Sequence, residues 1–258
     1  MLKDKLAKPV SGVHGEALRQ LLIKNRQRHS ALPINNQAQH LQSLMHWQTS
    51  RLKHTHADLF ASERYQQAAH YFVDDLYLSP NAIQRDRDLE RVFPTLVKLL
   101  PDETLETVAK AVELNILSAE LDQQLADKLF QLNLNHGQED LNQEITEEKY
   151  IQAYQACNAG ELRTHQLNLI KQIGHDLDHL VRIPLISWTL KLIRKPAHKK
   201  GLGNLHDFLE RGFSTFKALG GANEFMNIIS FREGQIITNL NSGQQSPFSI
   251  DLHIDRES

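Results

Sequence analysis

The fold class is decided by residues 101–132, PDETLETVAKAVELNILSAELDQQLADKLFQL. Pro101-Asp102-Glu103 is a strong helix start, with Asp102 as the expected N-cap. Beyond it, apolar side chains recur at spacings of three and four residues, at Leu105, Val108, Val112, Leu117, Leu121, Leu125 and Leu129. This is the period of an amphipathic helix, and it predicts one long helix closed near His136-Gly137.

The same period extends over most of the 258 residues, and glycine (12) and proline (8) are scarce. We therefore expect a single all-α domain, a bundle-like arrangement of about eight to ten helices. Residues 1–12 are expected to form a flexible N-terminus, 13–233 the helical domain and 234–258 a C-terminal tail.

The tail differs from the rest because Phe248, Ile250, Leu252 and Ile254 alternate with polar side chains, as in a strand. It could pair with residues 236–240 as a hairpin, lie extended over the helices or be disordered. If it is ordered, its apolar edge should pack on the helical body or on a second subunit.

Composition excludes several classes of protein. Lys and Arg total 29 against 31 Asp and Glu, so no basic excess favours nucleic-acid binding. The longest apolar stretch, residues 180–193, is too short for a membrane span and is interrupted by charge and proline. No export signal is visible at the start, which favours a cytoplasmic protein. A basic run, Lys191, Arg194, Lys195, Lys199 and Lys200, suits a helix C-terminus; contact with an anion or an acidic partner is the alternative.

Metal binding must be considered because the chain has 14 histidines. His175 and His179 share one helix face, but that face lies opposite the apolar stripe of residues 169–181, so we expect both rings to be exposed. No Glu-x-x-His motif occurs, and we expect neither a metal nor a cofactor. Glu63, His70 and Asp74 form another polar stripe, which lines a cavity or simply faces water.

Charge is densest where one aromatic helix end meets the start of the next helix. The residues concerned are Asp75, Tyr77, Arg85, Asp86, Asp88 and Arg91. We expect them to include a partly buried ionic network that joins the two helices. The same residues are our candidate binding site, as the polar floor of a pocket. No catalytic residue is indicated.

Several short motifs in order resemble an uncharacterised family of helical proteobacterial proteins. The blocks are Tyr71-Phe72-Val73-Asp74-Asp75-Leu76-Tyr77, Arg85-Asp86, Arg91-Val92-Phe93-Pro94, Leu180-Val181-Arg182-Ile183-Pro184, Arg194-Lys195-Pro196-Ala197 and Leu205-His206-Asp207-Phe208-Leu209-Glu210-Arg211-Gly212-Phe213. The family pattern reads Phe-Phe-Leu-x-Asp-Leu-Tyr-Gly, then Arg-Asp, then Arg-Val-x-Pro. This chain departs from it at Tyr71 and Leu78. The resemblance covers residues 60–233 and implies a single helical domain, without an activity.

Two classes of function stay open. The first is a non-catalytic helical binding protein for a small apolar molecule or a partner protein, which could also be a homo-oligomer. The second is a metal-dependent or acid–base helical enzyme. The absence of any recognised catalytic spacing favours the binding protein.

Overall fold

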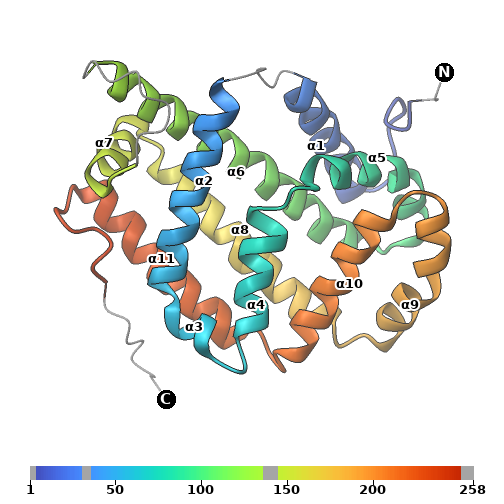
Figure 1. The fold of residues 1–258 in the computed structure, drawn as a ribbon. Helices are drawn as coiled ribbons and strands as arrows, with labels where there is room; N and C mark the ends of the chain where they lie inside the picture. The colour runs from blue at the N-terminus through green and yellow to red at the C-terminus, as the bar shows by residue number, and fades with distance from the viewer. Residues whose placement is uncertain (1–3, 31–35, 136–144, 251–258) are drawn as a thin grey trace.

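The computed structural model describes residues 4–30, 36–135 and 145–250, and these residues form an all-helical protein (Figure 1). The expected all-α architecture is confirmed, and the described residues contain no strand. The elements are α1 (Val13–Ser30), α2 (Asn36–Thr55), α3 (Ala57–Ala61), α4 (Gln66–His70), a π-helical turn η1 (Tyr71–Tyr77), α5 (Ala82–Leu99), α6 (Asp102–Asn135), α7 (Glu147–Cys157), α8 (Gly160–Leu180), α9 (Pro184–Lys199), α10 (Gly203–Ala218) and α11 (Asn223–Ser242).

The long helix α6 connects two of the three hydrophobic clusters. Near its start, Leu105, Val112 and Ile116 pack with residues of α1 and α5. Near its end, Leu125 and Leu129 pack with residues of α2, α7 and α11. The third cluster joins α3, α4, η1, α10 and α11, with Val181 beside α8. The periodic stretch of residues 101–132 therefore organises most of the core.

Residues 4–12, which precede α1, are anchored to the helical body at Leu6. Leu6 is only 2% exposed and belongs to the cluster formed by α1, α5 and α6. Its carbonyl accepts a hydrogen bond of 2.7 Å from Nη1 of Arg19. The expectation of a flexible segment overlooked this one leucine, whose burial stabilises the docked arrangement by about 1.5–3 kcal/mol.

The C-terminal helix is longer than expected, because α11 continues to Ser242. Gly234 does not end it; a left-handed glycine, Gly243 with φ +76°, does. Residues 236–240 are therefore helical, and the hairpin hypothesis is wrong. Phe248 and Ile250 pack against the cluster around α7, while Leu252 and Ile254 lie outside the described residues.

Two local features depart from the pattern of a regular α-helix. In η1 the Leu78 N–H donates to the Val73 carbonyl over 2.8 Å, five residues back. Leu76 lies in this wider turn and is 42% exposed. Pro94 lies inside α5, which begins at Ala82.

Candidate functional site

The six residues expected to form one network point in different directions. Two direct contacts join members of the set: the Arg85 guanidinium donates to the Asp75 carbonyl (2.7 Å), and Arg91 donates to the Asp88 carboxylate (3.1 Å). The first contact joins η1 to α5, but through a backbone carbonyl rather than through the expected ion pair. The other members find partners elsewhere in the fold, so the structure does not bring the six together as one pocket floor.

The first group lies between η1 and α10. The Asp75 carboxylate accepts a hydrogen bond of 3.1 Å from Nε of Arg211. The Arg85 guanidinium lies 4.0 Å from the ring centre of Phe208, a cation–π distance. These contacts attach α10 to η1 and to the start of α5. The sequence analysis had expected Asp75 and Arg85 to contact only other members of the six-residue set.

Asp86 instead faces α1. Its Oδ2 lies 2.8 Å from Nε2 of His29 and 2.8 Å from Nδ2 of Asn25. Asn115 on α6 also donates to it over 3.2 Å. Asp86 therefore links three helices of one cluster.

Asp88 and Arg91 connect α5 to the turn between α9 and α10. The Asp88 carboxylate is fully buried, and Arg91 extends from it to the carbonyls of Gly201 (3.0 Å) and Lys200 (2.7 Å). Arg91 thus donates hydrogen bonds to two backbone carbonyls of the turn. These bonds anchor the start of α10 on α5.

Tyr77 belongs to a buried polar network around Asp122 on α6. Its hydroxyl donates to Asp122 over 3.0 Å, and Arg163 on α8 donates to the same carboxylate over 3.2 Å. Gln48 completes the group at 2.7 Å from the Tyr77 hydroxyl. Burial raises the pKa of Asp122, and the Arg163 charge opposes that rise. The network is enclosed by helices, so its role is structural.

Two clefts are open to solvent and are lined mostly by residues with polar side chains. One, between α8 and α11, is lined by Thr164, Ser230, Phe231, Gly234, Gln235, Ile237, Thr238 and Asn239. The other contains Glu63, His70 and Asp74, the polar stripe of the sequence, with Tyr71, Asp75 and Arg211. In it Nδ1 of His70 lies 3.2 Å from Asp74, and both side chains are about half exposed. The two alternatives for this polar stripe therefore both hold, because its residues line a cleft that is open to water.

A surface feature that these contacts do not explain is α9, none of whose residues is fully buried. It lies at the edge of the molecule beside α10 (Figure 1). Leu185, Trp188 and Leu192 are 66%, 61% and 59% exposed. At 100° per residue they share one face, roughly opposite Leu190 and Ala197, which pack inward.

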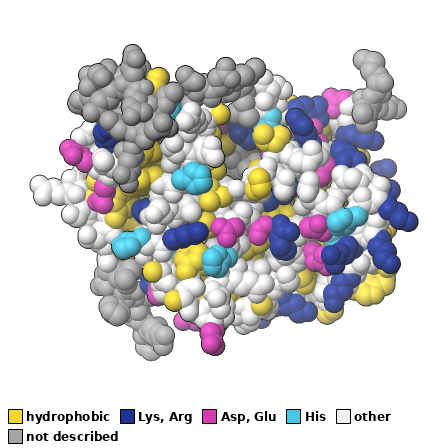
Figure 2. Space-filling view, viewed as in Figure 1, with side chains coloured by type: hydrophobic (Ala, Val, Ile, Leu, Met, Phe, Trp, Pro, Cys, Tyr) yellow, Lys and Arg dark blue, Asp and Glu magenta, His cyan; other side chains and the backbone are white. Residues whose placement is uncertain are grey.

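Positive charge accompanies this apolar face. The helix carries Lys191, Arg194, Lys195 and Lys199 and no acidic residue. Arg194 approaches Glu210 on α10 at 3.8 Å, whereas the three lysines have no ion-pair partner in the described part of the chain. Figure 2 shows Lys and Arg side chains gathered at the right of the molecule, near an apolar patch where Figure 1 places α9. We call Leu185, Trp188, Leu192 and these three lysines the α9 face.

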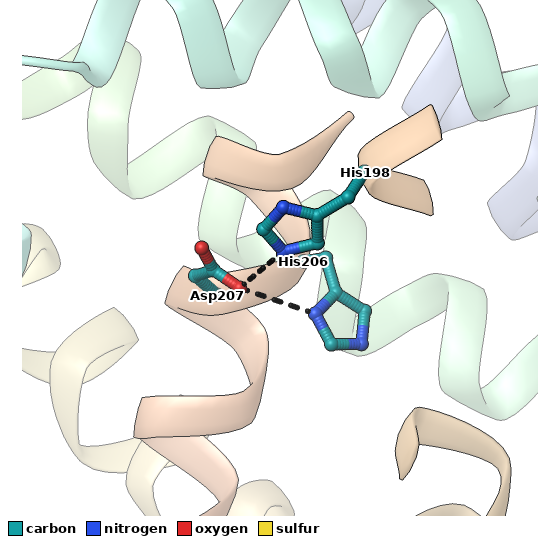
Figure 3. Close-up of side chains that lie close together, drawn as sticks. All are labelled: His198, His206 and Asp207. Atoms are coloured by element: carbon teal, nitrogen blue, oxygen red, sulfur yellow. Dashed lines mark hydrogen bonds and ion pairs between the residues drawn. The ribbon is translucent and has the colours of Figure 1, made fainter. Parts of the chain in front are cut away.

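A second feature lies where α9 turns into α10. His198 comes from the last turn of α9, and His206 and Asp207 come from the start of α10 (Figure 3). Nε2 of His198 lies 2.8 Å from Oδ1 of Asp207, and Nδ1 of His206 lies 3.4 Å from the same oxygen. Burial acts to raise the pKa of Asp207, but its hydrogen bonds with the two histidines lower that pKa below its ordinary value.

His175 and His179, the pair singled out in the sequence, carry no such arrangement. His179 is exposed as expected, and His175 is half-buried. Nδ1 of His175 lies 2.8 Å from the Asn223 side chain. The inward face of α8 is marked by Gly174 and Asp178, whose carboxylate accepts the Ala222 N–H over 3.0 Å.

The comparison with family models matches residues 25–247 to a domain of unknown function, DUF8198. The chain belongs to this family. No curated protein and no solved structure matches the chain. The match runs from α1 to the residue before Phe248 and so takes in α2 to α11. Membership of an uncharacterised family is thus confirmed. In the described residues of this DUF8198 protein, no helix has both the length and the apolar character that crossing a bilayer requires.

The sequence analysis singled out the basic run of α9, with an acidic partner as one alternative, but it missed the exposed apolar side chains and the group formed by His198, His206 and Asp207. The signal for the α9 face was present, because Leu185, Trp188 and Leu192 are spaced i, i+3, i+7 beside the basic run. That spacing also describes a core-facing helix, so it could not reveal exposure. His198 and His206 are eight residues apart and meet only because Gly201, with φ +67°, reverses the chain between them.

Proposed function

We propose that this protein is a non-catalytic helical binding protein, and that the α9 face is the surface with which it binds a partner protein. The observation that carries the proposal is the exposure of Leu185, Trp188 and Leu192 on one side of a formed helix. Apolar side chains spaced i, i+3, i+7 are the anchors of a helix that docks in an apolar groove.

The lysines define the chemistry of that groove. Lys191, Lys195 and Lys199 flank the apolar anchors, so an acidic rim on the partner complements them. Trp188 is the natural centre of the contact, because tryptophan is enriched among residues that dominate binding energy. A second copy of this chain fits poorly, since two such faces would place lysines near lysines.

Partner binding is better supported than binding of a small apolar molecule. A site for such a molecule is usually a concave and mainly apolar pocket. The two clefts described above are open and lined mostly by polar side chains. The apolar surface of α9 is instead convex, as suits insertion into another protein.

Site-specific crosslinking in the native host tests the proposal. A photoreactive amino acid replaces Trp188, and the matched control carries it at Leu162 on α8, which is 49% exposed. We expect one protein to crosslink at position 188 and not at position 162. The triple variant K191E/K195E/K199E should abolish that crosslink.

The purified partner then allows a direct affinity measurement. The variants W188A and K191E/K195E/K199E should each weaken binding by about tenfold or more, and added salt should weaken binding of the unaltered chain. Equal crosslinking at both positions contradicts the proposal. So does binding of the α9 face to anionic lipid vesicles without any protein crosslink.

A metal-dependent enzyme is the second candidate, favoured by the meeting of His198, His206 and Asp207. It ranks lower because neither cleft described above is lined by these three residues. We also propose, from the order of motifs in residues 60–233, that the protein is proteobacterial; its cytoplasmic location stays a separate prediction. Cell fractionation tests the location.

A further inference from the structure

We propose that His198, His206 and Asp207 form a binding site for one divalent transition-metal ion such as Zn²⁺. Each residue offers one ligand atom, and the three atoms lie within 4.8 Å of one another. Within the described part of the chain, this is the one group of three or more His, Cys, Asp or Glu side chains that meets this spacing. None of the three residues belongs to the α9 face, and the inference does not rest on the proposed binding of a partner.

His206 is held as a ligand by its surroundings. The residue is 3% exposed, and its Nε2 lies 2.8 Å from the Leu190 carbonyl on α9. A carbonyl can only accept, so the Nε2–H donates to it, and Nδ1 is the ring atom left to bind an ion. Metal-bound histidines are commonly oriented in this way, by donating their other N–H to a backbone carbonyl.

The Nδ1 atom lies beside a carboxylate oxygen. Nδ1 of His206 and Oδ1 of Asp207 are 3.4 Å apart. An ion that takes the place of a proton between these two atoms would bind both. Ligand atoms about 2.1 Å from a tetrahedral zinc ion lie roughly 3.4 Å apart, so this pair already has the spacing of two ligands.

His198 supplies the third ligand from the open side. Its side chain is 46% exposed, which gives an ion and water access. Gly203 makes room for the ring, because a Cβ atom at that position would lie 2.9 Å from Nδ1 of His198. Two imidazole nitrogens and one carboxylate oxygen suit Zn²⁺ and its neighbours, and three protein ligands leave the fourth position to water.

The test uses the full-length chain without a His-tag and Zn²⁺ as the probe. Equilibrium dialysis with elemental analysis should give one tightly bound ion per chain. The variants H198A and D207N should each weaken binding by about tenfold or more, since loss of a residue that merely orients a ligand already weakens affinity by about 10- to 100-fold.

His70 provides the matched control. It is an exposed histidine beside a carboxylate, with Nδ1 3.2 Å from Asp74, but it belongs to no three-ligand group among the described residues. H70A should bind Zn²⁺ like the unaltered chain. As a second readout, Co²⁺ should give a visible absorption band that H198A alters and H70A does not. The proposal is overturned if no stoichiometric ion binds, or if H198A, D207N and H70A bind Zn²⁺ equally.

Discussion

At the scale of single residues, the fold depends on charges enclosed between helices. Asp122 is 4% exposed and lies 3.2 Å from Arg163. Removing one partner of such a pair leaves an uncompensated charge in the interior, which is worse than having neither charge. Because both charges are enclosed in the interior, changing this pair tests directly whether buried charges stabilise the fold.

We expect R163M to reduce the free energy of unfolding by about 3–5 kcal/mol, because it leaves Asp122 buried without its cation. The double variant D122N/R163M should recover about half of that loss or more. Urea denaturation measures both. K24M is the control, since Lys24 and Glu120 form an exposed pair, worth at most about 1 kcal/mol. An R163M loss no larger than that of K24M would show that the buried network does not stabilise the fold.

Glu233 gives a prediction about acid stability. It lies 2.6 Å from Arg51 and 2.9 Å from His56. Burial acts to raise its pKa, but Arg51 and His56 lower it from 4.5 to about 2. A carboxylate whose pKa falls on folding stabilises the protein above its unfolded pKa and loses that contribution as pH falls towards the folded value.

The unaltered chain should therefore lose about 3 kcal/mol of unfolding free energy through this group between about pH 5 and about pH 2. E233Q should lack this part of the pH dependence, and E120Q, which alters an exposed pair, should retain it. Denaturant titrations across the acid range measure the slopes. Parallel slopes for E233Q and E120Q would exclude the buried carboxylate as their source.

At the scale of elements, α8 and α11 pack closely because a glycine lies between them. A Cβ atom at Gly174 would lie 2.5 Å from Sδ of Met226, a fully buried side chain. Gly234 is a second helical glycine at the same pair of helices, but its Cβ would lie 3.7 Å from Leu167, an ordinary contact.

The two glycines should therefore respond oppositely to alanine. G234A should stabilise the protein by up to about 1 kcal/mol, because alanine loses less conformational freedom in a helix. G174A has the same gain in helix stability, but its added methyl group overpacks the interface between the two helices. Overpacking costs roughly 1–3 kcal/mol, so G174A should be less stable than the unaltered chain. Thermal melts of the two single variants decide the matter. Stabilisation by G174A would mean that the two helices are more loosely packed than described.

At the scale of the whole molecule, the sequence was sufficient for the helical class and most helix positions. The period of residues 101–132 gave the long helix directly, and α6 begins at Asp102. Gly234 was misleading because a glycine inside a helix looks like a stop when its neighbour on α8 is unknown. The π-helical turn that contains Leu76 has no sequence period of its own.

The candidate sites were less predictable for a physical reason. Each of Asp75, Tyr77, Asp86 and Arg91 finds partners on helices distant in sequence, such as α10, α6, α1 and the α9–α10 turn. Local charge density identified residues that form buried or bridging contacts, but it could not identify the partners in those contacts. The α9 face posed the opposite problem, since its periodicity suggested a buried stripe where the fold leaves one exposed.

The central claim, that the α9 face is free in the isolated chain and available to a partner, is tested most directly by tryptophan fluorescence. The chain has two tryptophans, and Trp47 stacks on Tyr150 in the core at 4.1 Å between ring centres. In a W47F variant, Trp188 is the sole tryptophan, and excitation at wavelengths that tyrosine does not absorb selects its emission. We predict emission typical of water-exposed indole, ready quenching by acrylamide and no change with protein concentration. Blue-shifted emission with protection from acrylamide, or protection that grows with concentration, would show that this chain or a second copy already covers α9 and would contradict the account.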